Sequence, residues 1–364
     1  MKKFLSCVAL FLAPVLLFVS LFGYIVYASG EWRSEEEIVQ RVLSGEPAFL
    51  GLAYRDNTRY YKHLVASGKK ADLLVLGTSR SMQFHGEFFN TGSFYNAGGA
   101  AAYVHEFQFF LENLPEDALP DTLLIVLDQY FFEEGWSNVL ALPELDYSHY
   151  TFDAGIAVPE AIRGWANGKY SLLDALKPHE NMYGMAAVGR GSGFYADGSY
   201  SYGKLMDHPE DGTDVGFHDS FDRITHGINR FEYADTVYQP SLDTIASLLE
   251  WCHAHNIQVV GIIPPYAPSV YNRMMETGRY GYINQMPQAL GEMFEPYGYE
   301  LFDFSYMPDT ADDQYIDGYH GGDRVYAALT LQLAEKSRIL QDKIDTDYLN
   351  RALAPNDNPL RLTQ

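Results

Sequence analysis

The sequence predicts an α/β fold built on a parallel β-sheet. Five short apolar runs occur along the chain, and their hydrophobicity is continuous rather than alternating, as in strands that are covered on both faces. Helical stretches separate several of the runs, which implies parallel strands joined by right-handed crossovers. The five runs span residues 72–77, 93–98, 122–132, 257–266 and 299–307. In such sheets the chemistry gathers at the carboxyl ends of the strands.

The first segment of the chain is apolar and long enough to cross a bilayer. Two lysines precede an uncharged stretch from Phe4 to Ala28, which at roughly 25 residues exceeds the apolar core of about 7 to 15 residues in a signal peptide. The lysines before it and the acidic residues after it predict a cytoplasmic N-terminus. A cleaved signal peptide is the alternative, because Val26 and Ala28 stand where small residues precede a cleavage site. Both interpretations export the remaining chain.

We therefore expect residues 1–30 to be a signal anchor in the cell membrane and residues 31–364 to form an extracytoplasmic α/β domain. The chain has 364 residues, of which 47% are hydrophobic, enough for a packed core. It carries 48 acidic and 25 basic residues, a formal charge of -23. A phosphate backbone would be repelled by this charge, so nucleic acid is excluded as a partner.

The helices are predicted from the spacing of apolar residues and from the residues that end each helix. Two helices, in residues 31–45 and 57–68, each end at a glycine, the residue that best adopts the left-handed turn after a helix. Further helical stretches cover residues 100–114, 240–256 and 282–298, and a last helix covers about 323–336.

Between about residues 133 and 235 the alternation of strands and helices fails. The segment is rich in Tyr, Gly, Asp and His, and a structureless loop of that length is improbable in a compact domain. We predict an insert with its own packing, which caps or borders the site. Its aromatic side chains could stack on sugars, but we favour the interpretation that they fill the core of the insert. Its acidic clusters at 207–214 and 218–222 lack the ligand spacing of a calcium loop. We predict no metal site and no cofactor.

One turn and one loop carry residues suited to nucleophilic chemistry. Ser79 lies in "GTSRS" directly after the first apolar run, and Asp317 lies three residues before His320, just ahead of the last helix. A serine hydroxyl needs a base to take its proton and a third group to orient that base. The Asp317 spacing allows the carboxylate to fix the tautomer of His320, which leaves the other ring nitrogen for a hydroxyl.

Three motifs together resemble a known superfamily. "GTSRS" after the first strand, "NAGG" at 96–99 after the second and "DGYH" at 317–320 look like the first, second and fifth sequence blocks of the SGNH/GDSL hydrolases. With the apolar N-terminus and "PPY" at 264–266, the chain is similar to the exported acyl-transfer relatives that act in alginate O-acetylation and teichoic-acid D-alanylation. The resemblance covers roughly residues 55–340, with the insert unmatched.

The resemblance implies a three-layer, flavodoxin-like parallel sheet and a role for each motif residue. Ser79 would be the nucleophile, His320 the general base and then acid, and Asp317 its orienting partner. The backbone N–H groups of Ser79 and Gly98 would hold the oxyanion.

The chain departs from the family in the third block, which supplies an asparagine to the oxyanion hole. The equivalent strand end offers Asp128 and Gln129. Gln129 could donate its amide, whereas an ionised Asp128 would oppose a developing negative charge. Loss of one such donor costs about 10²- to 10³-fold in rate, and the exported relatives often lack it, so the departure favours transfer over broad hydrolysis. Arg80 could clamp a substrate carboxylate or phosphate, but pairing with an acidic neighbour is the more frequent role of such an arginine.

These expectations lead to a membrane-anchored serine enzyme of the acyl-ester type. It would transfer an acyl group, by resemblance acetyl, to a cell-surface polysaccharide or remove one from it. A transferase would need an acyl source outside the cell, which in similar systems is a multipass membrane O-acyltransferase. The alternatives are a non-catalytic glycan-binding or assembly protein on the same scaffold, and a secreted carboxylesterase for small esters.

Overall fold

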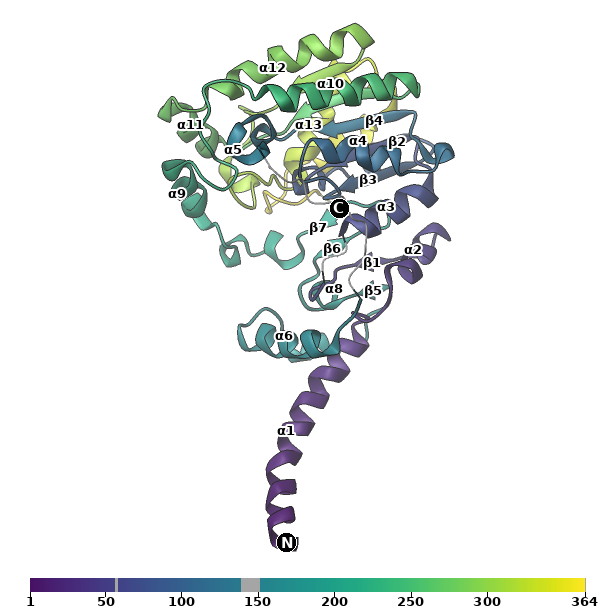
Figure 1. Ribbon diagram of the computed structural model, residues 1–364, viewed down its shortest axis with the longest axis vertical. Coiled ribbons are helices and arrows are strands. Elements are labelled where there is room, and N and C mark those ends of the chain that lie inside the picture. Colours follow the sequence, from purple (N-terminus) through teal and green to yellow (C-terminus); the bar gives the residue numbers. More distant parts are fainter. Residues whose placement is uncertain (56–57, 139–150, 364) are drawn as a thin grey trace. The chain divides into compact units, whose positions relative to one another are not determined.

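Five parallel strands form the main sheet of the computed structural model, which describes residues 1–55, 58–138 and 151–363 (Figure 1). The strand order is β3-β2-β4-β8-β9, and each neighbouring pair is parallel. The strands are β2 (Leu73–Gly77), β3 (Phe94–Gly98), β4 (Thr122–Val126), β8 (Gln258–Ile263) and β9 (Glu300–Asp303). The predicted α/β class and parallel sheet are confirmed. Every residue of β2, β3 and β4 is buried, which explains the unbroken apolar runs.

The helices around this sheet include five of the six that the sequence predicts; the sixth, in residues 31–45, is α2 (Glu35–Leu43) of the N-terminal unit described below. The five are α3 (Thr58–Lys69), α4 (His105–Glu112), α10 (Gln239–Ala254), α12 (Gly281–Phe294) and α13 (Asp323–Lys336). The sequence analysis did not anticipate four more: α5 (Glu134–Ser137), α9 (His218–His226), α11 (Pro268–Thr277) and α14 (Thr346–Ala352). Helix α10 packs against both α4 and α12. The predicted end of α3 at Gly68 is wrong by one residue, because Lys70 adopts the left-handed conformation with a φ of 52°.

A second group of elements uses the start of the chain and part of the predicted insert. Its helices are α1 (Lys2–Ala28), α2 (Glu35–Leu43), α6 (Ala154–Ala166), α7 (Leu172–Ala175) and α8 (Met185–Arg190). A small sheet has the order β5-β1-β6-β7, formed by β1 (Phe49–Leu50), β5 (Met182–Tyr183), β6 (Gly193–Phe194) and β7 (Tyr200–Ser201). Strands of two residues leave no periodic signal, so the sequence did not reveal them.

The contacts divide the chain into two compact units. The N-terminal unit contains residues 1–57, 148–196 and 201–204, and the sheet unit contains 58–147, 197–200 and 205–364. This division differs from the predicted boundary at residue 30, because α1 shares an apolar core with α6. The segment 133–235 is likewise divided between the units rather than packed as one insert, and residues 139–150 of it lie outside the described part.

Helix α1 has the properties of a membrane span. It contains 27 residues, and the mean hydropathy of its most apolar 18-residue window is 2.6, with none of that window buried. Among the described helices it is the one that is long and apolar enough to cross a bilayer.

Candidate active site

The turn after β2 presents the hydroxyl of Ser79 at the carboxyl edge of the main sheet. Thr78 caps the short 3₁₀ helix that follows, because its Oγ1 accepts a hydrogen bond from Arg80 N at 3.1 Å. Ser81 Oγ donates to Thr78 O at 2.8 Å and tightens the turn. Thr78, Arg80 and Ser81 are buried, whereas Ser79 is only half-buried. The sequence around Ser79 therefore holds the turn by side-chain bonds and leaves this one hydroxyl accessible.

The loop before α13 is built around Asp317. One carboxylate oxygen of Asp317 accepts hydrogen bonds from Tyr319 N at 3.0 Å and His320 N at 2.8 Å. Ile316 N donates to His320 O at 2.8 Å, which closes the loop on itself. Gly318 has no room for a side chain, because an added Cβ would collide with Ser220 Oγ. The three-residue spacing of Asp317 and His320 is thus the spacing of a hydrogen-bonded turn.

The structure brings the turn and the loop together. Ser79 Oγ lies 2.8 Å from His320 Nε2, and His320 Nδ1 lies 2.7 Å from Asp317 Oδ2. These residues are 241 positions apart at their widest, and they meet because the strands are parallel and end at one edge of the sheet. This arrangement allows Nδ1–H to donate to the carboxylate and Nε2 to accept the serine proton.

The Asp317 carboxylate is suited to hold the imidazole and to stabilise its charged form. Burial raises the pKa of Asp317, but the charge of His320 and the hydrogen bonds from His320 and Tyr319 lower it by more, so that the net shift is downward. Asp317 is therefore ionised at neutral pH. The charge that develops on His320 as it takes a proton has a fixed counter-charge 2.7 Å away.

Arg80 is a structural residue in this conformation rather than a substrate clamp, which corrects the binding role considered for it. A guanidinium has five N–H donors, and the Arg80 side chain makes five hydrogen bonds to the protein. Their acceptors are Tyr319 O, Asp128 Oδ1, Gln129 Oε1, Pro264 O and Pro265 O. The side chain is 1% exposed, so no donor remains for a ligand.

These contacts make Arg80 the link between the two halves of the site. Its Nε bond to Tyr319 O, 3.0 Å long, ties the serine turn to the residue next to His320. The hydroxyl of Tyr326 on α13 donates to the backbone oxygen of Arg80. Burial lowers the pKa of Arg80, but the charge of Asp128 and the neighbouring tyrosines raise it by more, so the side chain stays a cation. The position of Arg80 explains how Ser79 and His320 are held next to each other.

The negative charge of Asp128 was expected to disfavour an oxyanion at this site, but Asp128 has two partners inside the protein. Its two oxygens accept hydrogen bonds from Arg80 Nη1 at 2.8 Å and from Thr78 Oγ1 at 2.7 Å. Both members of the Arg80–Asp128 ion pair are buried. The negative charge of Asp128 is therefore compensated inside the protein.

Two of the three predicted oxyanion donors are engaged elsewhere. Gly98 N donates to Asn96 Oδ1 at 2.7 Å, and the amide of Gln129 donates to Pro264 O at 2.7 Å and to Ser305 Oγ at 3.0 Å. The proposed role of Gln129 is thus contradicted by its burial and its saturated amide, and that of Gly98 by its bond to Asn96. Ser79 N has no protein acceptor among the described residues and remains a candidate donor.

No family model matches this chain. A search of curated proteins likewise finds no significant match. The interpretation of the site therefore depends on the geometry of its own residues.

A cluster of aromatic rings and one arginine lies beside His320, and the sequence analysis did not identify it. The Tyr319 and His320 rings are 4.5 Å apart, and Arg230 Nη1 lies 3.4 Å from the Tyr319 hydroxyl. The Arg230 guanidinium also lies over the rings of Tyr130, at 5.5 Å, and Trp136, at 5.3 Å. Arg230 makes no ion pair with a carboxylate in the described part of the chain. This cluster offers stacking surfaces and a cation to a ligand near Ser79; the spacing of its members in the sequence gave no signal.

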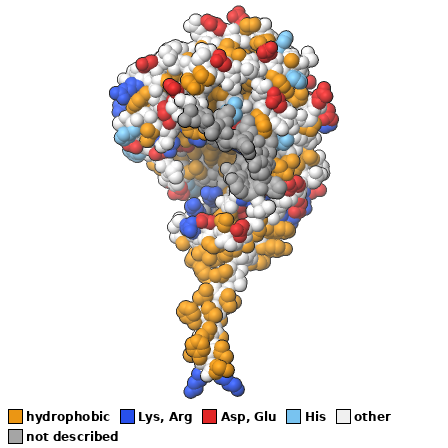
Figure 2. Space-filling model, viewed as in Figure 1, with side chains coloured by type: hydrophobic (Ala, Val, Ile, Leu, Met, Phe, Trp, Pro, Cys, Tyr) orange, Lys and Arg blue, Asp and Glu red, His pale blue; other side chains and the backbone are white. Residues whose placement is uncertain are grey.

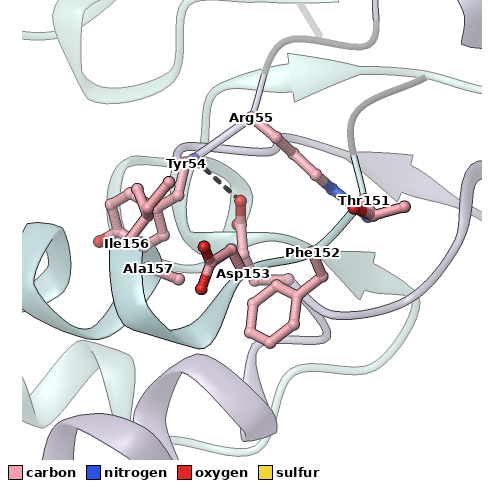
Figure 3. A pocket seen from close by; sticks show the side chains of 8 residues that line it. Tyr54, Arg55, Thr151, Phe152, Asp153, Ile156 and Ala157 are labelled. Carbon is pink, nitrogen blue, oxygen red and sulfur yellow. Dashed lines mark hydrogen bonds between the residues drawn. The ribbon is translucent and has the colours of Figure 1, made fainter. Parts of the chain in front are cut away.

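Two cavities can be described, one in each unit. In the sheet unit, a cavity of about 190 Å³ is lined by Tyr103, His105, Ser137 and Tyr238, among others. In the N-terminal unit, a cavity of about 330 Å³ lies between the segment 54–55 and the start of α6 (Figure 3).

Three potential metal ligands also lie close together in the sheet unit, although the sequence predicts no metal site. Ligand atoms of His85, Glu87 and Asp197 are all within 4.8 Å of one another. However, both Asp197 oxygens already accept hydrogen bonds, Oδ2 from Gly86 N and Oδ1 from Ser199. His85 Nε2 faces Asp323 Oδ1 at 3.1 Å. Asp197 and His85 thus also have protein partners.

Proposed function

We propose that the chain is a serine enzyme of the acyl-ester type that works through an acyl-Ser79 intermediate. The observation that carries the proposal is the continuous hydrogen-bonded path from Ser79 Oγ to His320, 2.8 Å, and from His320 to Asp317, 2.7 Å. His320 takes the Ser79 proton as the hydroxyl attacks the ester carbonyl, and it returns the proton to the leaving alcohol. Water or a sugar hydroxyl then resolves the intermediate, with His320 again as base.

The fold supports an SGNH-like interpretation. Numbered along the chain, the strand order β3-β2-β4-β8-β9 is 2-1-3-4-5, the order of flavodoxin-like doubly wound sheets. The motifs "GTSRS", "NAGG" and "DGYH" come after β2, at the end of β3 and before α13. The placement of these motifs at strand ends and before the last helix supports the proposal.

The proposed substrate is an acyl ester, by resemblance an acetyl ester, of a cell-envelope polysaccharide. Helix α1 supports a membrane-anchored enzyme whose remaining chain lies outside the cell. A multipass membrane O-acyltransferase would supply the acyl group if the enzyme is a transferase. Tyr319, Trp136 and Arg230 are suited to contact a sugar ring beside His320.

A second candidate function is a non-catalytic glycan-binding or assembly protein on the same scaffold. The specific observation that favours it is the oxyanion site, where Gly98 N and the Gln129 amide are both engaged with protein acceptors. With Ser79 N as the remaining predicted donor, an enzyme would need a donor from elsewhere or would react slowly.

Turnover of an acetyl ester tests the proposal. The full chain in detergent is incubated with p-nitrophenyl acetate, with and without an oligosaccharide acceptor, beside Ser79→Ala. We expect slow release of nitrophenol that Ser79→Ala abolishes, and acetylated oligosaccharide if the enzyme is a transferase. Equal rates for the wild-type and Ser79→Ala chains would rule out the acyl-Ser79 intermediate and favour the scaffold protein.

A further inference from the structure

Helix α6 packs directly on the C-terminal part of the apolar helix α1. The α6 residues on this side are small, namely Ala157, Ala161 and Gly164, and all three are buried. Ala157 and Ala161 share a hydrophobic core with Phe22 and Ile25 of α1. Small residues at this spacing let two helix backbones approach closely, as they do inside membranes. Within the N-terminal unit, α1 is therefore held by packing against α6 and not only through the chain that follows it.

A stripe of larger apolar residues runs beside this contact face. Val158, Ile162 and Trp165 recur at helical spacing. Val158 and Ile162 are partly buried and pack against the core shared with α1, whereas Trp165 is 37% exposed. The Trp165 ring lies 6.1 Å from that of Phe18 and 5.6 Å from that of Phe22. The apolar stripe of α6 is thus continuous with the exposed surface of α1.

The side of α6 opposite this stripe carries charged residues together with one exposed apolar residue, Ile156. Glu160 and Arg163 form an ion pair there, and on a helical projection they stand opposite Ile162 and Trp165. The two flanks of the helix therefore differ: one carries Ile162 and Trp165, and the opposite one carries the ion pair.

The segment after α6 adds exposed apolar side chains that no described part of the protein covers. Leu173 of α7 is 78% exposed and Leu176, directly after α7, is 44% exposed. Figure 2 shows that apolar side chains also cover α1 down to its lysine-bearing end. Leucines left open beside a membrane-spanning helix are suited to contact lipid.

The length of α1 indicates how deep in a bilayer the apolar residues of α6 would lie. Its 27 residues span about 40 Å, whereas a hydrocarbon core is about 30 Å thick, or about 20 residues of helix. Counted from Phe4, that core ends near Gly23. Trp165 contacts Phe18 and Phe22, so α6 lies at the outer boundary of the core. Exposed aromatic residues at the same end of α1, Tyr24 and Tyr27, are typical of a membrane interface.

We propose that α6 and α7 lie in the headgroup interface of the bilayer that α1 crosses. Trp165, Leu173 and Leu176 contact the acyl chains, while the Glu160–Arg163 side faces water. The inference rests on α1 as a membrane span and not on the chemistry of Ser79. A second contact with the membrane fixes the rotation of the N-terminal unit about the axis of α1, which a single helix would leave free.

Spin labels test this arrangement in the full chain. Cys7→Ser and Cys252→Ala remove the two native thiols, and a nitroxide is attached at Leu173→Cys. The matched control is Val215→Cys in the sheet unit, which is 48% exposed. In vesicles of phosphatidylcholine and phosphatidylglycerol, collisions with oxygen report lipid and collisions with a nickel chelate report water. We expect oxygen to dominate at position 173 and nickel at position 215.

Two results would overturn the inference. Nickel accessibility at position 173 equal to that at position 215 would place α7 in water. Low collision rates with both reagents at position 173 would mean that a protein covers the surface. If the Leu173 variant does not fold, a chain that keeps Trp165 as its one tryptophan serves instead, with Trp32, Trp136 and Trp251 changed to Phe. Brominated lipid should then quench Trp165 fluorescence, and unquenched emission would equally contradict the inference.

Discussion

At the scale of single residues, Arg80 decides whether the site is assembled. Its five hydrogen bonds join the serine turn, the carboxyl ends of two further strands and the loop that carries His320. A lysine retains the charge but lacks the planar fork that makes these bonds. Arg80 is therefore a positioning residue in our account, and it has no contact with the substrate.

We predict that Arg80→Lys lowers both stability and kcat while leaving KM little changed. Removing the charge altogether, as in Arg80→Met, leaves Asp128 buried without its partner, which costs about 3–5 kcal/mol. Urea unfolding and ester kinetics measure the two effects. Arg338→Lys is the control, because Arg338 pairs with Glu300 while its own side chain is 79% exposed. A stable Arg80→Lys chain with only a raised KM would instead indicate a substrate clamp.

We predict that Asp317→Asn slows the reaction about 10³- to 10⁴-fold, because the asparagine favours the wrong tautomer of His320. The loop should stay folded, because an asparagine can still accept hydrogen bonds from the N–H groups of Tyr319 and His320. The rate of p-nitrophenyl acetate turnover measures the loss. Asp312→Asn, an exposed capping residue that accepts Ser269 N at 3.0 Å, is the matched control. Retention of the full rate in Asp317→Asn would remove the carboxylate from the mechanism.

The sequence predicts some of these residues better than others, for a physical reason. Ser79, Asp317 and His320 stand at strand ends or in a short turn, so topology alone brings them to one edge of the sheet. The partners of Arg80 and Gln129 depend on which groups face them after folding. The bond from Gly98 N to Asn96 Oδ1 is different, because it joins residues two positions apart, the spacing of an Asx-turn.

At the scale of elements, an ion pair ties the start of α13 to the segment after the serine turn. His85 Nε2 lies 3.1 Å from Asp323 Oδ1, and Asp323 occupies the first turn of α13, where a negative charge is favoured. Burial lowers the pKa of His85, but Asp323, and to a smaller degree Asp197 and Glu87, raise it by more, to about 9. The folded protein therefore keeps His85 protonated where the unfolded chain does not.

The raised pKa of His85 predicts that the folded protein loses stability as the pH rises. The pKa of His85 is higher in the folded protein than the value of about 6.5 in the unfolded chain. Protonation of His85 therefore contributes fully to the stability of the fold below pH 6.5, and this contribution is lost as the pH rises toward 9. The loss is on the order of 2–3 kcal/mol. Urea unfolding at pH 6 and pH 9 should show a smaller difference for His85→Gln than for the wild-type chain. An identical difference in the two chains would show that His85 does not titrate as described.

Strands β2, β3 and β4 follow most clearly from the sequence, because they are fully buried and need a continuous apolar run. The edge strand β9 is only partly buried. The 122–132 run ends as a strand at Val126, and its last residues, Gln129–Phe132, form a 3₁₀ helix. The two-residue strands of the N-terminal unit depend on isolated backbone pairs, such as Leu50 with Phe194. Such pairs leave no pattern in composition, so the predicted insert gave no hint that part of it packs with the N-terminus.

At the scale of the whole molecule, the candidate chemistry and the membrane contact belong to different units. Ser79, Asp317 and His320 all lie in the sheet unit, whereas α1 and α6 lie in the N-terminal unit. The net charge of -23 keeps the chain from binding anionic surfaces without specific contacts. Changes in α6 or α7 should therefore alter the membrane contact without altering the reactivity of Ser79.

Reaction with a fluorophosphonate tests the central claim most directly, because the probe bonds only to a serine whose proton is removed by a base. The full chain in detergent is treated with the probe, and the mass and position of the adduct are determined. We predict one adduct, on Ser79, formed much more slowly in His320→Ala. A folded wild-type chain without the adduct, or an adduct that forms equally fast in His320→Ala, would contradict the account.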